Sequence, residues 1–131
     1  MILMDTCAVV WDALDSKKLT TRAKKAIQKA DENSELLICD ISIWEISMLV
    51  QRGRIEIDET FTILIRLILS SRNYSVINIS PEIAELSVNL GNEINNDPAD
   101  RLIVATSILK QAPVVTADKN LRDASMLKTL W

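Results

Sequence analysis

The chain has 131 residues, of which 48% are hydrophobic and 25% charged, and this composition is typical of a soluble globular protein. It has no histidine and only 2 glycines, which excludes histidine-based catalytic triads, histidine-ligated metal sites and glycine-rich phosphate loops. A net charge of -3 and a pI near 5.0 argue against a protein that coats nucleic acid non-specifically.

The start of the chain and its most apolar run bear on where the protein resides. The opening stretch, MILMDTCAVVWDAL, lacks the basic start of a signal peptide and carries two aspartates, so we expect a cytoplasmic protein. The apolar run at 61–69 is too short to span a bilayer and contains Arg66, so no membrane association is expected. Cys7 and Cys39 lack metal-binding spacing and are expected to be buried free thiols.

Strand and helix patterns alternate along the first half of the chain. Residues 2–4 form a short apolar run that predicts a strand, and a short helix is predicted at 6–14. Thr20 or Thr21 then caps a basic amphipathic helix, and a second strand is predicted at 35–39. Ser42 is predicted to open a helix that reaches about Gln51, and Asp58 to open another that contains 61–69.

The second half of the chain continues the alternation. Strands are predicted at 74–79 and 112–118, with a short edge strand at 127–131. Ser80 and Asp97 each precede a proline, which is the pattern of a capped helix start. Continuous apolar strands between helices predict an α/β fold, in which a mostly parallel sheet of four to five strands is covered on both faces. We expect one domain that spans residues 1–131.

Four acidic residues are predicted to gather at one edge of this sheet. Asp5 and Asp118 directly follow strands, whereas Glu45 and Asp100 each lie one turn into a helix beside a strand. Open parallel sheets place their functional sites beyond the carboxyl ends of the strands, near the switch in strand order. The four acids therefore define a candidate site.

Each acid also has a purely structural interpretation. Asp5 is suited to cap the helix that follows it, and Asp118 to form a turn. Glu45 stands three residues after Ser42, the spacing of a capping box, and Asp100 in a first helical turn interacts favourably with the helix dipole. Taken together, four like charges around one crevice repel each other unless a cation binds between them. All-oxygen ligation favours Mg²⁺ or Mn²⁺, which suits metal-assisted phosphodiester hydrolysis.

Four motifs in order give the chain a resemblance to a known family. The stretches MILMDTCAVVW, ICDISIWEISMLVQRGRIEI, NNDPADRLIVATSI and VVTADKNL resemble the PIN-domain family, and most closely the VapC-type toxins of bacterial toxin–antitoxin systems. The resemblance implies an Mg²⁺- or Mn²⁺-dependent endoribonuclease built as a three-layer α/β/α sandwich. It further implies a homodimer and a cognate antitoxin. Many relatives carry a histidine two residues before the Asp-Pro of the third motif, where this chain has Asn95.

The resemblance also implies roles for individual residues. Asp5, Asp100 and Asp118 are expected to bind the metal, and Glu45 to hold or orient a metal-bound water. Thr6 and Thr116, next to two of these acids, are expected to donate hydrogen bonds to the metal ligands; the alternative is that they are ordinary threonines at strand ends.

Substrate and partner contacts are less strongly marked in the sequence. Arg101 is interpreted as a phosphate contact, as an ion-pair partner of an acid, or as a solvated helix charge. Lys24 and Lys25 belong to a basic run that is either an RNA-binding face or a solvated helix side. The apolar helix at 63–69, with Ile46, Leu49 and Val50 on the preceding helix, predicts either a deeply buried helix or an interface for a second subunit or an antitoxin.

Two other functions remain open from sequence. The first is a PIN nuclease that acts in RNA processing outside a toxin–antitoxin pair. The second is a non-enzymatic phospho-receiver module, which also gathers acids and Mg²⁺ at strand ends. A receiver requires paired acids after the first strand, where this chain has only Asp5, and Lys119 directly follows Asp118.

Overall fold

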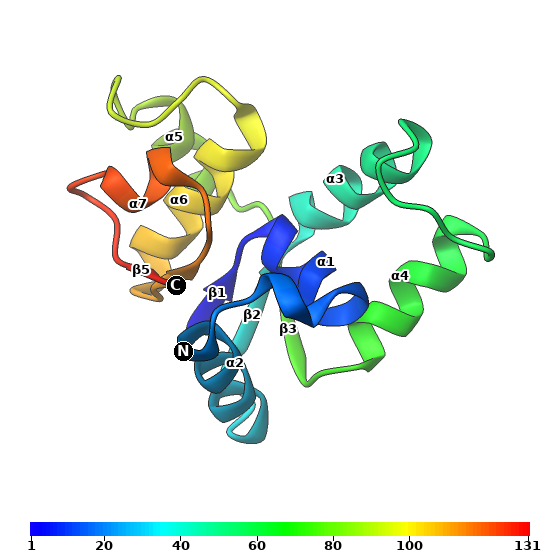
Figure 1. Cartoon of the computed structure of the whole chain (residues 1–131). Helices are drawn as coiled ribbons and strands as arrows, with labels where there is room; N and C mark the ends of the chain where they lie inside the picture. Colours follow the sequence, from blue (N-terminus) through cyan, green and yellow to red (C-terminus); the bar gives the residue numbers. More distant parts are fainter.

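The computed structural model describes all residues from Met1 to Trp131 and is built around one five-stranded sheet (Figure 1). The strands are β1 (Ile2–Met4), β2 (Leu36–Cys39), β3 (Tyr74–Ile77), β4 (Val114–Val115) and β5 (Thr129–Leu130). They lie in the order β3-β2-β1-β4-β5, and every neighbouring pair is parallel. The predicted parallel sheet is confirmed, and the C-terminal LKTLW stretch supplies its fifth strand at one edge.

Helices cover both faces of this sheet. They are α1 (Thr6–Leu14), α2 (Thr21–Glu32), α3 (Asp40–Gln51), α4 (Phe61–Ser70), α5 (Pro81–Val88), α6 (Pro98–Lys110) and α7 (Lys119–Asp123). Figure 1 shows α1, α3 and α4 on one side of the strands and α5, α6 and α7 on the other. The predicted three-layer α/β/α sandwich is therefore confirmed. No helix combines the length and the apolar character needed to cross a membrane.

Neighbouring residues along a strand pack into two separate hydrophobic cores, one on each face of the sheet. Met4 and Ile38 pack with α1, α2 and α4, whereas their neighbours Leu3 and Leu37 pack with α6 and α7. All four side chains are almost inaccessible to solvent. Because both faces of the sheet are covered, both sides of each central strand must be apolar, which explains the unbroken hydrophobic runs in the sequence.

The strand order reverses between β1 and β4. The chain builds outwards from β1 through β2 to β3, and then returns to the other side of β1 with β4 and β5. This reversal is the switch point at which open parallel sheets form their sites. The backbone N–H of Asp5 donates to the carbonyl of Val115 across the switch, at 3.1 Å. The acid after β1 is therefore fixed to the end of β4.

Most helices begin at a capping residue. Of the two threonines considered for α2, Thr20 is the cap and accepts from the Ala23 N–H at 3.1 Å. Two helix starts differ from the sequence-based expectations. Helix α3 begins at Asp40, two residues before Ser42. The cap of α4 is Thr60 and not Asp58. The short helix α7 was not predicted from the sequence.

The apolar surface of α3 and α4 is mostly used inside the molecule. Ile46, Leu64 and Ile68 are buried in the core on the α1 side of the sheet. The helix at 63–69 is thus largely a core helix, and of these three side chains Leu64 and Ile68 also line a hollow beside α1. Only Ile63 and Leu67 of α4 remain exposed as large apolar side chains.

Candidate active site

Asp5 is the most buried acid of the candidate site, with 5% of its surface exposed. Its Oδ1 accepts the Thr6 N–H at 2.8 Å, and its Oδ2 accepts the Thr116 hydroxyl at 2.6 Å. Asp5 is also the N-cap of α1, so the structural and the functional interpretations coexist in one residue. The two hydrogen bonds fix the plane of the carboxylate at the carboxyl end of β1.

Glu45 reaches the same place from α3. Its Oε1 accepts the Thr6 hydroxyl at 2.5 Å, and that hydroxyl also lies 2.9 Å from the buried hydroxyl of Ser42. The capping-box interpretation of Ser42 and Glu45 is wrong, because α3 starts before Ser42 and neither side chain caps it. Thr6 instead connects the carboxylate of Glu45 to the residue next to Asp5.

Thr116 connects Asp5 to the acid that follows β4. While its hydroxyl donates to Asp5, its oxygen accepts the backbone N–H of Asp118 at 3.0 Å. Asp118 caps α7 through its Oδ1, which accepts the Leu121 N–H at 3.0 Å. The two threonines predicted to support the acids are therefore both in contact with them.

The Asp-Pro motif places two aspartates in different roles. Asp97 caps α6, and its Oδ1 accepts the N–H groups of Ala99 and Asp100 at 2.9 and 3.2 Å. The Asp100 side chain does not cap the helix; its Oδ2 accepts the amide of Asn95 at 2.9 Å. Asp97 is accounted for by helix capping, whereas the carboxylate of Asp100 is held towards the acid site.

Burial and mutual repulsion raise the pKa values of three of these acids. Desolvation, followed by the charges of Asp5 and Asp100, raises the pKa of Glu45 to about 7 against the lowering effect of the Thr6 hydrogen bond. Desolvation, then the charges of Asp5, Asp97 and Asp118, raises the pKa of Asp100 to about 6. Burial likewise raises the pKa of Asp5. The pKa values of Asp5, Glu45 and Asp100 are therefore each raised in part by the charges of other acids that come from separate segments of the chain.

This crowding predicts how the stability of the metal-free protein depends on pH. A carboxylate with a raised pKa keeps its proton in the folded state at a pH where the unfolded chain releases it. The stabilisation is complete below about pH 4 and is lost as the pH rises through about 6 for Asp100 and about 7 for Glu45. We expect the melting temperature in EDTA to fall between pH 5 and pH 8. Glu45→Gln should flatten this slope, and an equal slope in the variant would contradict the prediction.

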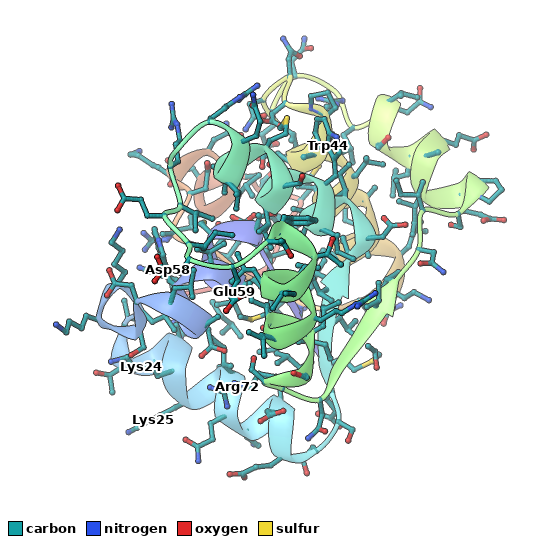
Figure 2. The ribbon with its side chains drawn as sticks, turned by 90° about the vertical axis from the view of Figure 1, so that its right-hand side faces the viewer. Lys24, Lys25, Trp44, Asp58, Glu59 and Arg72 are labelled. Carbon is teal, nitrogen blue, oxygen red and sulfur yellow. The ribbon has the colours of Figure 1, made fainter.

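Three basic residues predicted to contact substrate lie elsewhere or are occupied. Arg101 donates from Nε to the Ser87 carbonyl at 2.8 Å, and from Nη1 to the carbonyls of Gly91, Ile94 and Asn95 at 3.0–3.2 Å. These donors hold the 89–97 loop instead of a phosphate. Figure 2 shows Lys24 and Lys25 on α2, far in that view from Trp44, which precedes Glu45 on α3. Neither lysine takes part in any of the ion pairs of the structure.

Three further residues take part in hydrogen bonds around the site. Asn95 contacts Asp100, whereas Ser42 contacts Thr6 and Asn120 contacts Asn95. The family resemblance drew attention to Asn95, and the sequence indicated Ser42 only as a helix cap. Asn120 was not identified from sequence, since its partner lies 25 residues away. Lys119, which a receiver site would need beside the acids, forms an exposed ion pair with Asp123 at 2.7 Å.

The donor set fits a hard divalent cation. The acid side chains offer only oxygen ligands. Burial first, and then repulsion between the carboxylates, raises the pKa values of Asp5, Glu45 and Asp100, and a bound cation would offset both effects. As the side chains stand, no three of the cysteine, aspartate and glutamate residues lie together closely enough to hold a metal ion. Mg²⁺ does not require three such ligands, because it keeps several waters and typically uses one or two carboxylates.

Comparisons with known proteins find similar sequences and a similar structure. The sequence profile of the PIN domain matches residues 2–126. Ribonuclease VapC22 of Mycobacterium tuberculosis is 32% identical over 121 residues, which cover 92% of this chain and 89% of that protein. A toxin–antitoxin complex from Klebsiella pneumoniae contains a chain of similar structure, with a TM-score of 0.67 and 25% identity; the similarity covers 98% of this chain and 97% of that one.

Proposed function

Because the chain belongs to the PIN-domain family, we propose that it is a ribonuclease and acts as the toxin of a bacterial toxin–antitoxin pair. The observation that carries the proposal is the gathering of Asp5, Glu45, Asp100 and Asp118 at the switch point of the sheet. We propose the whole chain as one nuclease domain that acts on RNA in the cytoplasm.

We propose Mg²⁺ or Mn²⁺ as the cofactor, held by Asp5, Asp100 and Asp118. When bound, the cation would supply positive charge for the phosphate oxygens and promote ionisation of the attacking water. Thr116 holds the Asp5 carboxylate in place, and Thr6 does the same for Glu45. Glu45, whose pKa is raised to about 7, is suited to orient the attacking water and to accept its proton at a carboxylate oxygen near neutral pH.

Removal of metal is the direct test of this function. Excess EDTA should abolish RNA cleavage, and added Mn²⁺ or Mg²⁺ should restore it. Because the cation binds only the assembled site, metal at 100 times its dissociation constant should stabilise the fold by about 2.7 kcal/mol. Both effects are measured on the same preparation, by gel-based cleavage and by thermal melting. Undiminished cleavage in a preparation confirmed to be metal-free would exclude a metal-dependent mechanism.

We further propose that α1 and α4 provide a contact surface for a partner protein, either an antitoxin or a second subunit. Leu14 and Leu67 are 48% and 58% exposed, and both line a hollow of about 480 Å³ between these helices. Apolar side chains that line an exposed hollow are typical of protein interfaces.

The expected result is that Leu67→Glu weakens the complex with the antitoxin or the homodimer by about tenfold or more, because a charge would be buried in an apolar contact. Sedimentation and co-purification with the product of the neighbouring gene measure this. Leu109→Glu is the matched control, since Leu109 is exposed by 46% on α6, in the opposite helical layer. If Leu67→Glu assembles as well as the control, the surface lies elsewhere.

A further inference from the structure

We propose that Asn95 and Asn120 form a positioning pair that holds Asp100 and Asp118 in register with each other, a role that rests on the proposed metal-dependent nuclease. The pair joins the loop before α6 to the first turn of α7. Asn95 donates from Nδ2 to the Asp100 carboxylate at 2.9 Å and to Oδ1 of Asn120 at 3.1 Å. Asn120 lies two residues after Asp118 on the helix that Asp118 caps.

The backbone determines which way each amide faces. The N–H of Asp97 donates to Oδ1 of Asn95 at 2.8 Å, and a backbone N–H has no choice but to donate. The amino group of Asn95 must then face Asp100. In the same way, the N–H of Asn95 donates to Oδ1 of Asn120 at 3.0 Å, which leaves the Asn120 amino group to donate to the Glu93 carbonyl at 3.2 Å. Each of these N–H donors therefore has an acceptor, and each side-chain carbonyl oxygen has a donor.

Further hydrogen bonds hold the loop at 89–97, one set from the α6 side and another from the α7 side. Arg101, on the α6 side, donates to three of its carbonyls, those of Gly91, Ile94 and Asn95. On the α7 side, the Glu93 carboxylate accepts the N–H and hydroxyl of Ser125. Asn120 lies between these anchors and is the only side chain that bonds both Asn95 and the Glu93 backbone. The contact between Asn95 and Asn120 therefore ties α7 to Asn95, the residue that orients Asp100.

In this arrangement the neutral side-chain amide of Asn95 orients the carboxylate of Asp100. Asn95 donates to one oxygen of Asp100, and the other oxygen forms no hydrogen bond within the protein. Outer partners of metal ligands typically change metal affinity or activity by 10- to 100-fold when they are removed. Asn120 is exposed and Asn95 is only half-buried, so their loss should disturb the overall fold little.

The test compares Asn95→Ala, Asn120→Ala and the double variant with the wild type and with Asn33→Ala. Asn33 is a suitable control because its amide makes one exposed bond, to the Lys29 carbonyl at the end of α2. Mn²⁺ affinity is measured by calorimetry, the metal-free melting temperature by circular dichroism, and kcat and KM by cleavage of a defined RNA. Each single variant should bind Mn²⁺ about tenfold more weakly. Its kcat should fall while KM for RNA and the metal-free melting temperature stay close to those of the control.

The double variant reports whether the two residues act together. If they act through one bridge, its loss of Mn²⁺ affinity should not exceed that of the weaker-binding single variant. Wild-type Mn²⁺ affinity in both single variants, or strictly additive losses, would overturn the positioning pair while leaving the nuclease proposal intact. A wild-type protein that neither binds Mn²⁺ nor cuts RNA would instead refute the proposed function itself.

Discussion

Asp100→Asn is expected to remove nearly all RNA cleavage and to weaken Mn²⁺ binding. The asparagine keeps an oxygen in place but loses the negative charge that a metal ligand supplies. The loss of activity should exceed the about 100-fold upper range found for outer partners of metal ligands. The metal-free variant should melt at the wild-type temperature or above it, because repulsion from Asp5 and Asp118 disappears. Cleavage in saturating Mn²⁺ and thermal melting in EDTA measure the two effects.

Asp97 offers the matched control for this substitution. Its carboxylate caps α6, a task that an asparagine performs equally well, so Asp97→Asn should change neither stability nor cleavage substantially. Asp97→Ala should cost about 1 kcal/mol of stability through loss of the cap and should still cut RNA. If Asp97→Asn is inactive and Asp100→Asn is active, the two aspartates have the opposite roles.

Arg72→Met is expected to produce the largest loss of stability away from the acid site. Arg72 donates from Nε and Nη2 to both oxygens of Asp12, at 3.0 and 2.9 Å, and from Nη1 to Asp31 at 3.2 Å. Figure 2 shows the arginine beside α2, in the turn that follows α4. The side chain of Asp12 is only 7% exposed, so the substitution leaves a nearly buried carboxylate without its partner. The expected cost is about 3 kcal/mol.

Thermal melting in buffer of fixed ionic strength measures this loss, which corresponds to a decrease of about 10 °C for a domain of this size. Arg66→Met is the control, since Arg66 is exposed on α4 and forms no ion pair. A second substitution, Asp12→Leu in the Arg72→Met background, should restore part of the stability by removing the unpaired charge. Equal melting temperatures for Arg72→Met and the control would show that the ion pair contributes nothing.

Local signals in the sequence were sufficient for the strands and for most helix starts. Caps such as Thr20, Ser80 and Asp97 act on amide groups two or three residues away, so a short window contains the whole interaction. The unbroken apolar strands reflect burial on both faces, which requires a covered parallel sheet whatever the details of the helices. Once the sheet is parallel, residues after strands gather at one edge, which is why Asp5 and Asp118 were identified without a structure.

Contacts between distant segments were decided only by the tertiary structure. Glu45 and Ser42 match a capping box in sequence, yet they meet Thr6 instead, because α3 starts at Asp40 and packs against α1. Arg101 follows Asp100 directly but donates to three carbonyls of the 89–97 loop. The partner of Asn95 lies 25 residues away on α7. Sequence spacing determines which groups are available, whereas the packing of the helices determines which of them meet.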